Sequence, residues 1–436
     1  MLIHKCIAIL LYSSVYLMLV SPQMNLSQNM LEWGPVHIYL FEIPLILAYV
    51  LSILLLPPAR DPAGVATYKI YSLFIPIVLI GFIGSIMYVS AAPQTVIKEI
   101  RPAMYWLSGI ILTFLGHRHL RLKTLSYVVA AGILTQFFCS FLAVKLGWSI
   151  IEHGRLLGRS VWFTPFFVIL LATMITYKKN LLAIGKYNIT PVVLILIPLL
   201  MGVLLCQNRT VWIVLALIAA WWLFFKTAGV NRLKFLFLIL VFISVVWQLT
   251  QFVPFFGDIK DSLTERFFEG TISSDGMKAT WEVNREIIYT NCLSDFKKHP
   301  IMGNGFAHEV YFDSSSYREG LEDRSSAYID NSFLEILVKT GLAGLAFFIM
   351  AIYQMYSVMR KALVRMEFSE EWLYLKTMVL AFPFFVLMAF NISTLYGYPE
   401  VMIFSLFFAK VSLMESKSNS LCSGNAAIAA SQGMSV

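Results

Sequence analysis

Charged residues are what this sequence has least of. Only 13% of its 436 residues are Asp, Glu, Lys or Arg, whereas a typical soluble domain has about 25%. Hydrophobic residues make up 58% of the chain, and its mean hydropathy is +0.74. This composition excludes an ordinary soluble domain and predicts an integral membrane protein.

Cysteine is scarce as well, with 5 residues scattered along the chain. Only Cys292 falls in a segment that we place outside the cytoplasm, so no disulfide framework is expected. The sequence has no Cys-x-x-Cys pair, histidine cluster, Walker loop or dinucleotide fingerprint. We therefore expect no metal and no cofactor. The net charge of +8 comes without a basic stripe interleaved with aromatic residues, so nucleic acid is not an expected partner.

Long apolar runs fill most of the chain. They are continuous, without the alternation of an outer-membrane barrel, and therefore predict helices. Since a span needs about 20 apolar residues, we predict an all-α polytopic membrane protein with about 12 transmembrane helices. The predicted spans are 5–20, 36–56, 70–90, 102–117, 125–147, 160–176, 188–206, 210–225, 234–253, 333–357, 373–391 and 396–412.

The distribution of Lys and Arg orients these spans. If the N-terminus is inside, basic residues gather in the inside connections, for example at Lys178, Lys179, Arg360 and Lys361. The positive-inside rule then places both termini in the cytoplasm. The first span lacks a clear small-x-small cleavage site, so we expect it to stay as a signal-anchor helix.

One polar segment, residues 254–331, interrupts the apolar runs and holds more than half of the 25 Asp and Glu residues. The same charge count places this loop outside the cytoplasm. We predict transmembrane helices 1–9 in residues 1–253, the external (periplasmic) loop in 254–331, helices 10–12 in 332–413, and a disordered cytoplasmic tail in 414–436. A membrane protein that concentrates its charge in one late loop is expected to have its chemistry there.

The loop contains local structure signals. Apolar residues at helical spacing, including Ile288 and Cys292, predict an amphipathic helix over about residues 275–298. The His-Pro step at His299 ends this helix, and the glycines that follow predict a turn. Asp330 or Asn331 is expected to cap the helix that re-enters the membrane.

Three arginines break the positive-inside pattern on the side where we place the loop. They are Arg155, Arg159 and Arg209. Arginine at membrane depth is costly and usually functional, and a planar guanidinium that stays charged suits a diphosphate. The simpler interpretation is that these side chains reach toward lipid headgroups.

Other candidates also have a functional and a simpler interpretation. Arg285 could contact a ligand or lie on the polar, solvated face of the loop helix. His299 could act chemically or only end the helix and pack. His308 could be a base or an ordinary loop histidine. Glu335 could act in the site or only pair with Lys339, four residues later on the helix.

The order of several short motifs resembles a known family. The stretches HPIMGNGF (His299–Phe306) and DNSFLEILVKTGLAGL (Asp330–Leu345) are similar to the signature of the O-antigen ligase and O-antigen polymerase (Wzy-type) superfamily. The stretches RLLGRSVWFTP, QNRTVWIVLAL and NREIIY resemble its arginine-bearing segments. Each motif alone is weak, and their order together carries the resemblance.

This resemblance implies a multi-pass enzyme of the bacterial cytoplasmic (inner) membrane. It would catalyse metal-independent glycosyl transfer at the outer face, with an undecaprenyl-diphosphate-linked glycan as donor. The lipid membrane and this glycan are the expected partners, with flippase and chain-length regulator proteins as further candidates. The expected catalytic residues are Arg155, Arg209, Arg285 and Asp330, and the expected substrate-binding residues are Arg159, His299, His308, Asn331 and Glu335.

One departure distinguishes the members of this superfamily. Asp330 stands where the ligases carry a histidine, which favours a polymerase of lipid-linked repeat units over a ligase that transfers finished glycan to lipid A-core. A transporter or flippase of lipid-linked glycans is the alternative from another class. It is disfavoured because the two halves of the chain show no repeat. The product stays open between O-antigen, capsule and another exopolysaccharide.

Overall fold

The computed structural model describes residues 2–20, 30–33, 36–55, 69–89, 96, 100–101, 105–109, 120–145, 151–152, 155–156, 163–185, 188–206, 209–225, 280–312, 324–326, 329, 331–390, 401–412 and 414.

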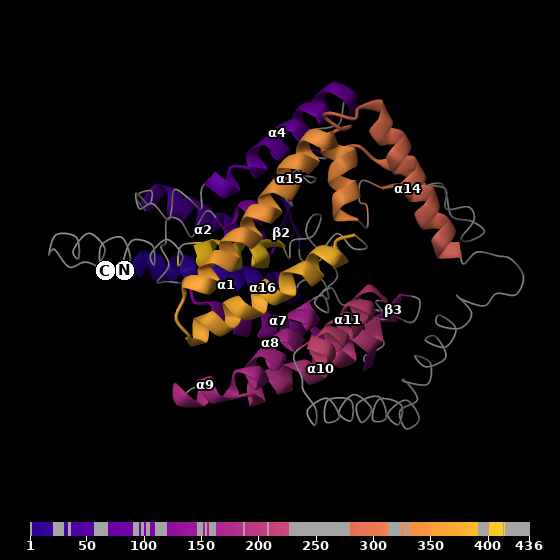
Figure 1. Cartoon of the computed structure of the whole chain (residues 1–436). Helices are drawn as coiled ribbons and strands as arrows, with labels where there is room; N and C mark the ends of the chain where they lie inside the picture. Colours follow the sequence, from indigo (N-terminus) through magenta and orange to yellow (C-terminus); the bar gives the residue numbers. More distant parts are fainter. Residues whose placement is uncertain are drawn as a thin grey trace, which may run out of the picture.

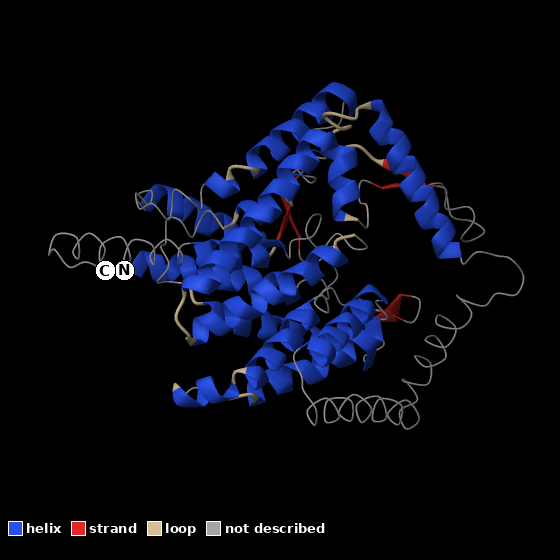
Figure 2. Ribbon diagram, viewed as in Figure 1, coloured by secondary structure: helices blue, strands red, loops and turns tan. Residues whose placement is uncertain are grey.

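Helices dominate the described part of the chain (Figures 1 and 2). They are α1 (Leu2–Val20), α2 (Glu42–Leu55), α4 (Phe74–Gly84) with the π-helical η3 (Ser85–Val89), α7 (Leu122–Lys145), α8 (Thr164–Thr176), α9 (Lys178–Ala183), α10 (Thr190–Cys206), α11 (Arg209–Phe225), α14 (Thr280–Lys298), α15 (Ser332–Arg365) and α16 (Glu370–Met388). A further apolar helix covers Val401–Ser412.

Three short antiparallel hairpins accompany the helices, which make up most of the described residues as the all-α prediction expected. They pair β1 (Met30–Trp33) with β2 (Val36–Tyr39), β3 (Ile151–Glu152) with β4 (Arg155–Leu156), and β5 (Val310–Phe312) with β6 (Arg324–Ser326). Each is two-stranded. Such small hairpins leave no signal in a hydropathy profile, because their few residues cannot show a period.

The helices have the composition and surface of membrane spans. Among the described residues, 4 helices are long and apolar enough to cross a membrane: Leu2–Val20, Lys69–Val89, Ser332–Arg365 and Glu370–Met388. Shorter apolar helices include Glu42–Leu55, Thr164–Thr176 and Val401–Ser412. Large apolar side chains point outward, for example Ile53 (66% exposed) and Leu194 (61%), which fits contact with lipid. The protein is therefore a membrane protein.

The predicted count of about 12 spans is not confirmed. Predicted span 234–253 lies outside the described residues, and 102–117 lies largely outside them. Span 36–56 begins as strand β2, and its helix starts only at Glu42. Predicted span 333–357 falls within α15, which is long and apolar enough to cross a membrane, although its backbone leaves helical geometry at Gly341 (φ 65°, ψ −167°).

Contacts at the helix ends sort the connections onto two ends of the molecule. Lys123 at the start of α7 lies 2.6 Å from Glu370 at the start of α16, and Tyr177 at the end of α8 contacts Trp372. Figure 1 shows α9 at this end, whereas β3 and α14 lie on the far side of the molecule. This arrangement matches the predicted grouping of inside and outside connections. Which end faces the cytoplasm stays a prediction.

Aromatic residues join the chain's beginning, middle and end in the core. Phe74 stacks on Trp106 at 5.1 Å between ring centroids and meets Phe348 of α15 edge-on. The Tyr71 hydroxyl donates to the carbonyl of Ser405 at 2.6 Å. These contacts hold helix 69–89, which carries α4 and η3, between α15 and the C-terminal helix, and thereby fix the position of η3.

Candidate functional site

The predicted turn His299–Phe306 sits in the break of α15. The amides of Asn304 and Gly305 donate to the carbonyls of Val338 and Lys339, both at 2.9 Å. In the opposite direction, the amides of Leu342 and Ala343 donate to the carbonyls of Pro300 and Ile301, at 2.9 and 3.1 Å. A helix end leaves backbone groups without intrahelical partners. The turn supplies partners to both ends that the break creates.

Glycine is required where the turn and the break meet. Gly303 and Gly341 both have positive φ, 71° and 65°, a region that side chains with a Cβ rarely adopt. A Cβ on Gly303 would lie 2.5 Å from the Gly341 nitrogen, and one on Gly341 would lie 2.6 Å from the Gly303 nitrogen. The two glycines therefore permit two backbones to approach each other directly.

The other side of the turn docks on α4 and η3. The Phe306 amide donates to the Gly81 carbonyl at 3.1 Å, and the Ala307 amide donates to the Ser85 hydroxyl at 3.2 Å. Phe306 is fully buried. The His299 ring stacks on Tyr88, with 3.7 Å between ring centroids. The predicted loop residue His299 thus has a packing partner on a helix far away in sequence.

A small apolar cluster joins α14 to the first part of α15. Its buried members are Cys292, Val310, Ile329 and Val338. Cys292 is a free thiol with no exposed surface. Burial, together with the negative charges of Asp295 and Glu335, raises the pKa of the Cys292 thiol to about 12. This cysteine therefore stays protonated and acts as an apolar packing residue.

The first half of α15 carries two of the predicted site residues. Asn331 is its N-cap, and the Asn331 Oδ1 accepts from the amides of Phe333 and Leu334 at 3.0 Å. Four residues into the helix, Glu335 Oε1 lies 3.0 Å from Lys339 Nζ. Both side chains are almost completely buried, which makes this pair part of the protein's interior.

A second pair of a carboxylate and a basic side chain lies nearer the surface, between α14 and the residues after the turn. His308 Nε2 lies 2.8 Å from Asp295 Oδ2, and Lys298 Nζ donates to Asp295 Oδ1 at 2.7 Å. Burial of Asp295 raises its carboxyl pKa, but the hydrogen bonds from Lys298 and His308 outweigh this and lower the pKa below its usual value. Asp295 therefore stays ionised at neutral pH and holds the His308 ring in place.

The predicted arginines are placed only by their backbone. Arg155 lies in β4 and pairs with Glu152 in the hairpin register. Arg209 is the first residue of α11, and Arg285 lies in α14. The structure describes none of these three side chains, and Arg159 and Asp330 lie outside the described residues altogether.

Hairpin β3–β4 packs on α10, whose last residue is Cys206. Figure 1 shows β3 beside one end of α10 and α11, on the same side of the molecule as α14. The segments with Arg155 and Arg209 therefore share one end of the molecule with the segment that carries Arg285.

The structure brings four predicted residues, His299, His308, Asn331 and Glu335, into one assembly of α14, the turn, β5 and α15. Sequence reasoning missed Asp295, although it lies three residues after Cys292 on the packed face of α14. It also missed Tyr88 and Ser85, for which no local signal exists because their partners lie far along the chain. Within the described ranges, no group of 3 or more His, Cys, Asp or Glu side chains is placed to hold a metal ion.

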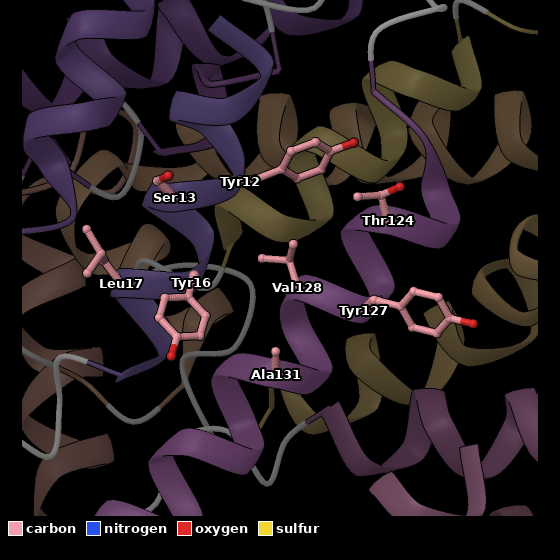
Figure 3. A pocket seen from close by; sticks show the side chains of 8 residues that line it. All are labelled: Tyr12, Ser13, Tyr16, Leu17, Thr124, Tyr127, Val128 and Ala131. Atoms are coloured by element: carbon pink, nitrogen blue, oxygen red, sulfur yellow. The ribbon is translucent and has the colours of Figure 1, made fainter. Parts of the chain in front are cut away.

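An open groove lies elsewhere, between α1 and α7 (Figure 3). Tyr12, Tyr16 and Tyr127 line it together with small and apolar side chains. The Tyr16 hydroxyl lies within 3.0 Å of Thr135 Oγ1, at one side of the groove. None of the predicted site residues lines it, so we do not assign the chemistry to this groove.

Residues 192–349 match the family model described as O-antigen ligase. The resemblance to the O-antigen ligase and polymerase superfamily is confirmed. The matched segment begins in α10 and ends in the second half of α15. It therefore includes Arg209, Arg285, α14, the His299–Phe306 turn and the break of α15 at Gly341. No curated protein matches the chain.

Proposed function

We propose that this protein is a polymerase that joins lipid-linked oligosaccharide repeat units into O-antigen or a related surface polysaccharide. At the coarser level, the family match supports a membrane enzyme that acts on glycans. The observation that carries the proposal is that the match contains the assembly in which α14, the His299–Phe306 turn and the broken helix α15 meet.

The donor side of the reaction requires positive charge. When the sugar leaves its carrier, charge develops on the lipid diphosphate, and fixed cationic donors stabilise it. We assign this task to Arg155, Arg209 and Arg285, whose segments share one end of the molecule. Arg285 is placed by its backbone in α14.

The remaining predicted residues would bind the sugars near the same place. Arg159, His299, His308, Asn331 and Glu335 are the substrate-binding candidates. Asp330, between the packed Ile329 and the cap Asn331, is the base that its position in the sequence predicts. We place this site at the outer face of the bacterial cytoplasmic membrane, with both termini in the cytoplasm and an undecaprenyl-diphosphate-linked glycan as donor.

The first rival is a ligase, the activity that the matched family's description names. Asp330, in the place of the ligases' histidine, supports the polymerase instead. The second rival is a transporter, because broken helices occur in transporters near the membrane midplane. Here the break in α15 is packed against the turn from the loop that we place outside, so it has a structural reason without transport.

A reconstituted assay separates these functions. Purified protein in lipid nanodiscs receives the lipid-linked single repeat unit extracted from a strain that lacks this chain. We expect a ladder of longer glycans that remain on the lipid carrier. Glycan transferred only to added lipid A-core would show a ligase, and unchanged repeat units with both acceptors present would contradict both enzymatic readings.

Single alanine substitutions of Arg155, Arg209 and Arg285 test the donor site in the same assay. Each is expected to remove about 2–4 kcal/mol of transition-state stabilisation, by analogy with one oxyanion donor. Lys297→Ala is the matched control, because Lys297 is an exposed cation on α14. Wild-type rates in all three arginine variants would overturn the assignment of the diphosphate site.

A further inference from the structure

The Asp295–His308 pair has the geometry of an oriented base. His308 Nε2 is held at 2.8 Å from Asp295 Oδ2, and among the described residues no hydrogen bond engages the other ring nitrogen, Nδ1. The two side chains keep 20% and 14% of their surface exposed. We propose that His308 Nδ1, rather than Asp330, accepts the proton of the acceptor sugar hydroxyl, and that Asp295 is the positioning residue. This inference rests on the proposed glycosyl transfer.

The hydrogen bond decides which nitrogen is basic. A neutral imidazole has one N–H donor and one acceptor nitrogen. Since Asp295 is ionised, it accepts from Nε2–H, which leaves the lone pair on Nδ1. When Nδ1 takes a proton, the adjacent carboxylate stabilises the imidazolium. A carboxylate that orients a histidine base in this way is a recurring catalytic arrangement.

The alternative carboxylates are less suited. Glu335 is buried and already paired with Lys339, so a sugar hydroxyl cannot reach it without breaking the pair. A general base works best when its pKa lies near the working pH, and imidazole is the side-chain type whose ordinary pKa lies nearest neutrality.

The elements of this assembly carry several titratable and charged groups besides His308. On α14 they are Asp295 and Lys298, on the turn segment Glu309 and His299, on η3 Tyr88, and on α15 the buried pair Glu335 and Lys339.

The proposed step balances as a substitution at the anomeric carbon. The acceptor hydroxyl oxygen forms a new bond to the anomeric carbon of the donor glycan. The bond from that carbon to the phosphate oxygen breaks, and its electron pair leaves with the lipid diphosphate. The hydroxyl proton moves to His308 Nδ1. The protonated ring then returns this proton to water before the next cycle.

The decisive variant is His308→Gln. The glutamine amide can take the place of Nε2–H and keep the hydrogen bond to Asp295, but it offers no basic nitrogen. We expect the elongation rate on the lipid-linked repeat unit to fall about 100-fold or more, with unchanged yield and thermal stability. Asp295→Asn should lower the rate as well, because it removes the carboxylate that orients the ring and stabilises the imidazolium. Lys297→Ala is again the matched control and should retain the wild-type rate.

The pH profile distinguishes catalysis from a structural role. The wild-type rate should fall on acidification, because a protonated imidazole accepts no proton. His308→Gln should lose this dependence, and Asp295→Asn should move it to lower pH, because it removes the charge that stabilises the imidazolium.

Three results would overturn the proposal. A stable His308→Gln variant could elongate at a rate near that of the wild type, or it could be slow but keep the wild-type pH dependence. The third result is that Asp330→Asn, and not His308→Gln, loses the pH dependence of the rate. Failure of the wild type to elongate any repeat unit would instead contradict the proposed function.

Discussion

Two pairs of a carboxylate and a basic side chain lie in the same assembly and differ in their exposure to solvent. Glu335 and Lys339 lie 3.0 Å apart with 2% and 1% of their side chains exposed. Asp295 and His308 lie 2.8 Å apart, but 14% and 20% of their side chains are exposed. The distances are alike, whereas the access is not. The sealed pair, Glu335–Lys339, lies in the protein interior, and the open pair, Asp295–His308, is accessible from solvent.

The loss of stability expected when one partner is removed also differs between the two pairs. A buried charge whose partner is removed has no water to replace it, so breaking a buried pair is strongly destabilising. A partly exposed pair is screened by solvent and contributes little to stability. We therefore expect substitutions in the sealed pair to act on folding and those in the open pair to act on rate.

The largest expected effect is that of Glu335→Ala. It removes the carboxylate that pairs with the buried Lys339 ammonium and should cost about 3–5 kcal/mol. Thermal unfolding in detergent and the yield in membranes would measure this loss. The double variant Glu335→Leu/Lys339→Met, which removes both charges, should recover most of the stability. A single variant as stable as the wild type would mean that the pair does not hold α15.

Gly341→Ala should have the next largest effect. Its cost combines left-handed strain of about 1–2 kcal/mol with displacement of the turn, because the new Cβ meets the Ile301 carbonyl. Gly185→Ala is the matched control, since Gly185 has a φ of 66° but no atom within 4 Å of the added Cβ. The difference between their unfolding temperatures isolates the packing at the break. Equal shifts would show that the turn is not locked there.

A smaller effect is expected at the stacked pair of His299 and Tyr88. His299→Ala should cost about 0.5–1.5 kcal/mol, the range for aromatic pairs. His299→Phe should keep the stack and the wild-type unfolding temperature. Elongation by the stable phenylalanine variant then reports separately on the predicted substrate contact. An alanine variant with undiminished stability would argue against the stack as a support of the turn.

The smallest effect concerns pH and the open pair. The pKa of Asp295 is lowered in the folded protein. Its ionised form therefore stabilises the folded state when the pH is above the carboxyl's ordinary pKa of 3.8. This contribution is lost as the pH falls through the lowered pKa of the folded state. On acidification below about pH 4, the wild type should lose slightly more stability than Asp295→Asn. A larger loss in the asparagine variant would contradict this sign.

Local patterns were enough to predict several features. Apolar runs predict the helices because burial in lipid needs only composition and length. The glycines after His299 predict a turn, Asn331 caps its helix, and Glu335 lies one helical turn from Lys339. Each of these depends on residues within a few positions of one another. The order of the motifs that indicated the superfamily is also a property of the sequence alone, and the match over 192–349 agrees with it.

Other features depend on residues that meet only in the folded chain. The apolar run 333–357 has no local sign of a strong break, since Gly341 alone is tolerated in many helices. The break becomes stable because residues 300–305 supply the backbone partners that each helix end needs. Asn304 reaches Val338 across 34 positions, and Ala307 reaches Ser85 across 222. The pairing of His308 with Asp295 arises in the same way, because the turn folds the chain back on α14 and brings a histidine to a carboxylate.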